Sequence, residues 1–407
     1  MSIKFRLIVM SFLQYAVWGA WLISLGAYLG GVLHFDGLQT GSFFATMGIA
    51  SLFMPAAMGV VADRWLPAQK VLGSCHIAAA LLLLAAAPQT DYARLYPLML
   101  LSVMFYMPTI ALSNSVAYSA LSRAGRDAVK AFPPIRVWGT VGFICAMVAV
   151  DLLKLAASAN QLYLSAGLGL ALGVYAFTLP GCAVSRRVEK KSWVERLGLQ
   201  AFSLFRQRKM AVFFFFSMLL GMSLQITNAF GNAYLTSHFG SMQEHRNAFG
   251  VEHANILISL SQLSETLCIL LIPFFMRRFG VKRVMLISMV AWVFRFGLLG
   301  AGDPGGGVWM LILSMLVYGV AFDFFNISGS LFVEQETNSA IRASAQGVFM
   351  IMTNGLGALI GSYAAGAVVD ACGWPTAWYV FAGYALTVAV AFALIFKQSR
   401  QAAYPSK

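Results

Sequence analysis

The chain has 407 residues, of which 59% are hydrophobic and only 11% are charged, and its mean hydropathy is +0.75. Soluble domains carry about 25% charged residues, so this composition excludes an ordinary soluble protein and indicates a membrane protein. The formal net charge of +13 could suggest a nucleic-acid partner, but the positions of the basic residues, described below, argue against one. The five cysteines are scattered and have neither metal-ligand nor disulfide spacing.

Apolar runs of ~20 residues, long enough to cross a membrane, recur about twelve times along the chain. In chain order the predicted spans are residues 3–30, 41–62, 71–87, 95–120, 134–150, 162–180, 210–235, 253–275, 284–301, 308–331, 343–369 and 374–396. The first run is longer than the ~7–15-residue apolar core of a signal peptide and lacks a clear cleavage site, so we interpret it as a span. We therefore predict an all-α membrane protein with twelve transmembrane helices.

The lysines and arginines indicate which side of the membrane is cytoplasmic. If both termini are cytoplasmic, 23 of the 28 basic residues fall in inner segments, while Arg94, Lys154 and Arg246 fall in outer loops. The remaining two, Arg136 and Arg295, lie inside spans. This asymmetry follows the positive-inside rule. We therefore predict cytoplasmic termini, and we expect no nucleic-acid partner.

A polar and basic stretch divides the chain into halves. Residues 181–209 form a predicted cytoplasmic linker between an N-terminal six-helix bundle, residues 1–180, and a C-terminal six-helix bundle, residues 210–407. A helix end, a basic turn and a helix start recur at residues 59–65 and 273–283, at the same place in each half. This pattern resembles the loop signature of the major facilitator superfamily, without its usual glycine in the first copy. The resemblance implies two bundles around a midplane cavity.

Charged residues are rare inside the predicted spans. The acids well inside spans are Glu265 and Asp323, and the in-span bases are Arg136 and Arg295. A charge near the middle of a membrane costs ~2.5–3.5 kcal/mol on insertion scales, and such residues usually face a cavity and have a function. The alternatives are structural: Arg295 pairs with Asp323, and Arg136 extends its side chain to the membrane surface.

Amide and aromatic side chains recur around these charges. The polar stripes at helical spacing are Gln225, Asn228 and Asn232, then Gln262 and Glu265, then Asp323 and Asn326. A single buried amide usually joins helices, but three stripes in one half favour a shared polar cavity. The neighbouring aromatic residues are Phe143, Tyr318, Phe322, Phe324 and Phe325. Rings beside amides and acids suit a flat ligand that also carries hydroxyl groups.

Other signals in the sequence do not indicate catalysis. We recognise no phosphate-binding loop, metal-ligand cluster or nucleophile constellation, so we predict that the chain is not an enzyme and uses no cofactor. The glycines of residues 355–361 miss the dinucleotide-binding spacing and lie in an apolar span, where small residues allow close helix contact. The glycosylation triplet at residues 326–328 lies inside a span and is interpreted as coincidental.

Several long motifs carry a resemblance to a known family. They are SFLQYAVWGAWL (residues 11–22), FPPIRVWGTVGF (132–143), LQITNAFGNAYL (224–235), SQLSETL (261–267), YGVAFDFFNISGSLFVE (318–334) and IRASAQGVFMIMTNG (341–355). Nearly end to end, the chain resembles the bacterial nucleoside:proton symporter family, which includes nucleoside and xanthosine permeases.

The resemblance implies proton-coupled uptake of nucleosides across the bacterial inner membrane. The substrate-binding residues that it implies are Arg136, Thr140, Phe143, Gln225, Asn228, Gln262, Glu265, Tyr318 and Phe322. Asp323 or Glu265 is the expected proton-coupling residue, because only a titratable group can carry a proton. The alternatives are an uncoupled nucleoside facilitator and an exporter of drugs or other solutes with the same fold. The expected partners are a nucleoside, protons and the lipid bilayer, and we expect a monomer.

Overall fold

The structure is a computed structural model that describes residues 2–127, 131–182, 199–337 and 341–396. Within these ranges all regular elements are helical, and ten helices are long and apolar enough to cross a membrane. The prediction of an all-helical protein is confirmed for this part of the chain. Residues 183–198 of the predicted linker lie outside the described residues.

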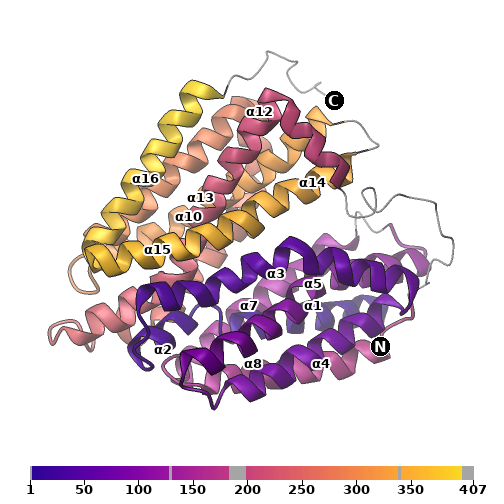
Figure 1. Ribbon diagram of the computed structural model, residues 1–407, viewed down its shortest axis with the longest axis horizontal. Helices are drawn as coiled ribbons and strands as arrows, with labels where there is room; N and C mark the ends of the chain where they lie inside the picture. The colour runs from indigo at the N-terminus through magenta and orange to yellow at the C-terminus, as the bar shows by residue number, and fades with distance from the viewer. Residues whose placement is uncertain (1, 128–130, 183–198, 338–340, 397–407) are drawn as a thin grey trace. The chain divides into compact units, whose positions relative to one another are not determined.

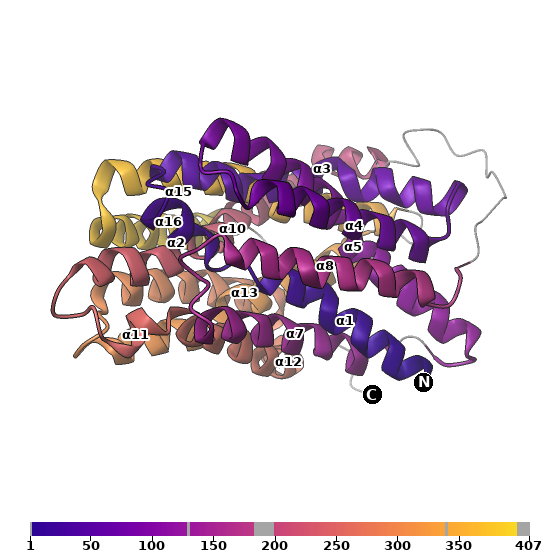
Figure 2. The ribbon, with the colours of Figure 1, turned by 90° about the horizontal axis from the view of Figure 1, so that it is seen from below.

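The helices group into two compact units, and each unit is described by itself. The first consists of Met1–Lys190 and Asn228–Ala233, and the second of Lys191–Thr227 and Tyr234–Lys407. The first unit contains the helices α1 (Ile3–Gly19), α2 (Leu25–Gly31), α3 (Gly37–Arg64), α4 (Ala68–Ala86), α5 (Tyr92–Arg123), α7 (Pro133–Leu152) and α8 (Asn160–Thr178) (Figure 1). α1 packs against α7 and α8, and α4 packs against α5 and α8 (Figure 2).

The first predicted span, residues 3–30, forms two helices in the structure. α1 ends at Gly19 and α2 begins at Leu25, with turns between them. Gly19 lies against α7, where a Cβ on it would come within 2.5 Å of the Phe143 carbonyl oxygen. α1 therefore ends where two backbones meet. The sequence does not predict this break, because the apolar run continues through it.

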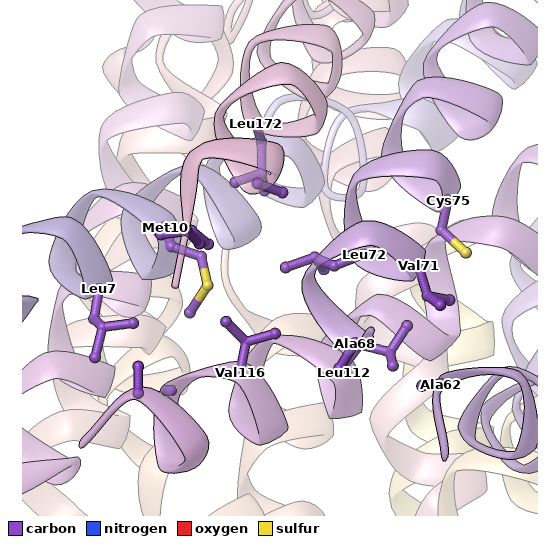
Figure 3. Close-up of a cluster of buried hydrophobic side chains, with 14 of the residues drawn as sticks. Leu7, Met10, Ala62, Ala68, Val71, Leu72, Cys75, Leu112, Val116 and Leu172 are labelled. Atoms are coloured by element: carbon purple, nitrogen blue, oxygen red, sulfur yellow. The ribbon is translucent and has the colours of Figure 1, made fainter. Parts of the chain in front are cut away.

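The core of the first unit forms where α1, α4, α5 and α8 converge. Figure 3 shows Leu7 and Met10 of α1 in one cluster with Leu72 of α4, Val116 of α5 and Leu172 of α8. Each of these five side chains is at most 2% exposed. Lipid tails are as apolar as these side chains, so moving the side chains from lipid into the core gains no hydrophobic free energy. The side chains therefore hold the helices together through close packing.

Glycine allows α1 and α7 to touch backbone to backbone. A Cβ on Gly142 would lie 2.1 Å from the Phe12 carbonyl oxygen, which is far inside van der Waals contact. We predict that Gly142→Ala lowers the melting temperature of the purified protein, because overpacking costs about 1–3 kcal/mol or more. Gly167→Ala in α8 is the matched control, since a Cβ there meets nothing within 4 Å. Equal melting temperatures for the two variants would contradict this contact.

The second unit contains longer helices. Its elements are η1 (Leu199–Arg206), α10 (Arg208–Ala233), η2 (Tyr234–His238), η3 (Phe239–Ser241), α11 (Phe249–Glu252), α12 (Ala254–Ala301), α13 (Val308–Glu336), α14 (Arg342–Met350), η4 (Ile351–Gly357), α15 (Ala358–Cys372) and α16 (Trp374–Ile395). The last residues of α10, 228–233, are grouped with the first unit. α12 packs along α13 and α16. An ion pair of 2.5 Å between Lys209 Nζ and Glu336 Oε1 joins the start of α10 to the end of α13.

Two predicted spans, residues 253–275 and 284–301, are the two arms of α12. Gly280 separates the arms with φ 73° and ψ 168°, a left-handed backbone conformation that favours glycine. The predicted basic turn is therefore a sharp kink at a single glycine. In the first half, the corresponding turn is the short gap between α3, which ends at Arg64, and α4, which begins at Ala68.

Small residues bring α10 against η4 and α15. A Cβ on Gly221 would lie 2.1 Å from the Thr353 carbonyl oxygen, and a Cβ on Gly361 would lie 2.5 Å from the Met222 Cα. The prediction that the glycines of residues 355–361 allow close helix contact is confirmed. η4 is a π-helical turn, a type that is rare and often occurs at functional sites.

Candidate functional site

Two acidic side chains approach each other where α12 packs against α13. Asp323 is 3% exposed and Glu265 is half-buried. Their carboxyl groups lie within electrostatic reach of each other and of the Tyr318 hydroxyl. The helices touch beside Glu265, where the Gly319 N–H donates to Ser264 Oγ at 3.3 Å. A Cβ on Gly319 would come within 2.5 Å of the Ser264 carbonyl oxygen, so glycine is needed for this approach.

Arg295, on the second arm of α12, is a buried cation that shares Tyr318 as a neighbour with these acids. One guanidinium nitrogen donates to the Ser314 carbonyl oxygen at 2.8 Å and lies 3.5 Å from Ser261 Oγ, and its Nε has no hydrogen-bond partner. The guanidinium carbon lies 4.5 Å from the centroid of the Tyr318 ring, a cation–π contact. No ion pair joins Arg295 to Asp323, both of which the structure describes, and Asp323 Oδ2 is buried without a hydrogen bond. The salt-bridge alternative for Arg295 is therefore not supported.

Aromatic rings surround Tyr318. Phe322 stacks on it with ring centroids 5.8 Å apart and an interplanar angle of 12°, and Trp292 contacts it edge-on at 6.2 Å. Phe322 is half-buried and also lines a pocket of the second unit, together with Trp292 and Phe325. The aromatic residues of α13 thus form both a support for Arg295 and one wall of a pocket.

The predicted amide side chains have unused hydrogen-bonding capacity. Gln225 and Asn228 lie one turn apart on α10, and Gln262 lies one turn before Glu265 on α12. Among the residues that the structure describes, the side-chain amides of Gln225, Asn228 and Gln262 make no hydrogen bond, although Gln225 is only 6% exposed. An amide that joined helices would be bonded to another helix, so this pattern favours ligand contacts over a structural role.

Arg136 of α7 lies over an aromatic ring of α1 in the first unit. Its guanidinium carbon is 3.9 Å from the centroid of the Tyr15 ring, so it stacks there instead of only extending toward the membrane surface. Phe143, two turns further along α7, is 8% exposed and meets Trp18 edge-on at 6.5 Å. Thr140 lies between them and is half-buried. α1 therefore supplies the support for the predicted residues of α7.

A buried polar network lies behind Trp18. The Gln14 amide donates to Thr109 Oγ1 at 2.7 Å and accepts at 2.9 Å from His76 Nε2, which must donate because an amide oxygen only accepts. The Tyr106 hydroxyl donates to the Gln14 carbonyl oxygen at 2.8 Å, and the Tyr106 ring lies 5.7 Å from Trp18. The network joins α1, α4 and α5 and fixes the position of Trp18. The spacing of residues along the sequence does not predict this network, because its members lie on three helices.

The predicted site residues fall in both units. Those of the first unit are Arg136, Thr140, Phe143 and Asn228. Those of the second unit are Gln225, Gln262, Glu265, Tyr318, Phe322 and Asp323, of which Glu265, Tyr318, Phe322 and Asp323 lie together. Sequence reasoning identified Arg295 as charged but missed Tyr15 and Trp18, although both belong to a motif, residues 11–22, that carries the family resemblance.

Comparisons with known proteins identify the family of this chain. A family model described as nucleoside H+ symporter matches residues 1–401. The xanthosine permease of Escherichia coli strain K12 is 53% identical over 98% of this chain and 96% of that protein. The nucleoside permease NupG of the same strain is 48% identical over the same shares. A crystal structure of the nucleoside transporter NupG (D323A mutant) superposes with a TM-score of 0.95 at 48% identity, covering 97% of this chain and all of that one.

These relatives are transporters rather than enzymes. Together with the ten helices long and apolar enough to cross a membrane, they identify a multi-pass membrane transporter. The chain belongs to the nucleoside H+ symporter family.

Proposed function

We propose that this chain carries nucleosides inward across the bacterial inner membrane together with protons. The single observation that carries the proposal is the cluster of ionisable groups at Asp323. A buried carboxyl group with an unbonded oxygen lies within electrostatic reach of a second carboxyl group, Glu265, and both acids share Tyr318 as a neighbour with a permanent cation, Arg295. One cation and two acids leave the cluster one proton short of neutrality. Binding a single proton balances the charge, which suits a proton carrier inside a membrane.

Each predicted binding residue has a proposed role. Glu265 and Gln262 hold the ribose hydroxyls, because a carboxylate accepts and an amide both donates and accepts. Gln225, Asn228 and Arg136 contact the edge of the base. Phe143 or Phe322 lies against the face of the base, with Tyr318 and Thr140 completing the site. Asp323 carries the proton, with Glu265 as the other candidate.

The proposed architecture is the major facilitator fold, with twelve spans and both termini in the cytoplasm. In the total of ten apolar helices, α12 is counted as one helix. α1 and α2 are not included, because each has fewer than 18 residues. Counting the broken pair α1–α2 as one span and the arms of α12 as two gives twelve. Residues 1–180 and 210–407 would be two six-helix bundles that rock about a central site, and residues 181–209 their linker. We propose that the protein acts as a monomer.

Uptake by purified protein in liposomes tests this function. A nucleoside is neutral, so only a second gradient can concentrate it. One proton moving inward across ~100 mV provides about 2.3 kcal/mol, enough for roughly fifty-fold accumulation. We expect radiolabelled uridine to accumulate when the outside is acidic and the inside negative, and this accumulation to collapse with a protonophore. Uptake that stops at the external concentration under both conditions would identify an uncoupled facilitator instead.

A further inference from the structure

A pocket in the second unit extends the candidate site beyond the predicted residues. It lies between α10, α12, α13 and η4, and its main side chains are Trp292, Phe322, Phe325, Asn326, Thr353 and Asn354. Three aromatic rings and two amides therefore face one hollow. Phe322 connects it to the stacked rings beside Asp323. The two asparagines have no role in the function proposed above.

Both asparagine side chains keep hydrogen-bonding capacity for a ligand. Within the described part of the chain, the Asn326 side chain makes no hydrogen bond, and that of Asn354 has only the Met350 sulfur at 3.8 Å. By contrast, the Gln346 side chain in the same unit is bonded to Ser330 through two hydrogen bonds of 2.7 and 3.1 Å. Both side chains are half-buried, so their donors and acceptors are open to water or to a polar ligand group that enters the pocket.

The backbone holds Asn354 at the pocket. Thr353 Oγ1 donates to the Phe349 carbonyl oxygen at 2.9 Å within the wide turn of η4. Gly221 of α10, another lining residue, lets the Thr353 backbone approach to a distance that no side chain would allow. The neighbouring Asn354 is therefore presented by a fixed turn rather than by a loop.

The position of the pocket along α13 relates it to Glu265. Gly319 marks the level of Glu265, because it touches the neighbouring Ser264. Asn326 follows Gly319 by two helical turns, which corresponds to about 10 Å along the axis. This separation is comparable to the length of a nucleoside. A ligand with its ribose at Glu265 can therefore bring the polar edge of its base to these asparagines, while the pocket of about 20 Å³ behind them has room for only a small substituent.

We propose that Asn326 and Asn354 form a subsite for the polar substituents of the nucleobase and so determine which bases are accepted. This inference rests on the proposed nucleoside transport and deepens it. Each amide offers both a donor and an acceptor, so the pair can bind carbonyl or amino groups on the base, while Phe322 packs against its face. Base selectivity then depends on α13 and η4 as well as on the residues named earlier.

Binding measurements with two ligands test the subsite. Inosine carries a carbonyl group on its base, whereas purine riboside has the same rings and sugar without exocyclic groups. In Asn326→Leu and Asn354→Leu, we expect inosine to bind about three-fold to ten-fold more weakly for each lost hydrogen bond, with little change for purine riboside. Ser330→Ala on α13 is the control, and we expect it to keep the wild-type ratio of the two affinities.

The outcomes separate this inference from the proposed function. A wild-type protein that binds neither ligand contradicts nucleoside transport itself. If the wild type binds both ligands, and the ratio of the two affinities is the same in the wild type, the two leucine variants and Ser330→Ala, the subsite is contradicted while nucleoside transport is not. Melting temperatures show whether the leucine variants fold. If either does not, Asn326→Ala and Asn354→Ala provide the same comparison with smaller side chains, and unchanged ratios there overturn the subsite equally.

Discussion

Asp323→Asn is expected to abolish proton-driven accumulation of nucleosides while leaving nucleoside binding intact. Asparagine keeps the size of the buried side chain but cannot take up and release a proton. Accumulation of uridine in liposomes should therefore fall from roughly fifty-fold to the external concentration, whereas counterflow, which needs no net proton movement, should continue. Isothermal calorimetry on the same preparation would measure uridine binding close to that of the wild type.

Glu265→Gln is the companion substitution with the opposite expected result. A carboxylate that accepts from ribose hydroxyls contributes about 1.5–3 kcal/mol, so its loss should weaken uridine binding by roughly ten-fold to more than a hundred-fold. Asp151→Asn, in a buried acid of the first unit, is the control and should change neither property. Accumulation that survives in Asp323→Asn and disappears in Glu265→Gln with normal binding would move the proton to Glu265.

Hydropathy was enough to locate the helices but not the points where they bend. Apolar runs predicted the membrane helices because lipid requires long apolar segments with internally bonded backbones. The same runs pass through the break after Gly19 without a change of composition. At residues 273–283 the sequence predicts a basic turn between two helices, because a basic sequence cannot distinguish a turn of several residues from a kink at a single left-handed glycine. The break after Gly19 depends on which backbones meet, and the kink at Gly280 depends on the torsion angles of one residue. A single sequence records neither.

The site was predictable within each helix but not across helices. Helical spacing predicts that Gln262 and Glu265 lie on one face, because positions three residues apart share a face and both residues belong to α12. The contact of Arg295 with Tyr318 instead of Asp323 depends on how α12 is rotated against α13. The stacking of Arg136 on Tyr15 likewise depends on the α1–α7 packing that Gly142 allows. Predicting such pairings requires the rotational orientation of each helix about its own axis. In lipid, the spacing of apolar residues determines that orientation only roughly.

Removal of the Arg295 cation is expected to have the other large effect, a loss of uridine binding and uptake. Arg295→Met keeps an unbranched side chain of similar reach but removes the cation, and leaves Glu265 and Asp323 to repel each other in a buried region. A hydrogen bond from a charged group, such as that of Arg295 to the Ser314 carbonyl oxygen, contributes about 1.5–3 kcal/mol, so we expect uridine binding and uptake to fall by roughly ten-fold to a hundred-fold. Arg295→Lys should retain part of both, because it keeps the charge but cannot reproduce the planar stacking on Tyr318.

A second substitution distinguishes charge balance from packing. If Arg295 acts by compensating the two acids, then removing one acid should offset the loss of the cation, and Arg295→Met with Asp323→Asn should bind uridine better than Arg295→Met alone. If Arg295 acts only through its hydrogen bond to the Ser314 carbonyl oxygen and its contact with Tyr318, the double variant should bind no better, because neither contact returns. The coupling energy from this double-mutant cycle decides between the two. A positive rescue of binding without recovery of accumulation would assign the balancing charge to Arg295 and the transported proton to Asp323.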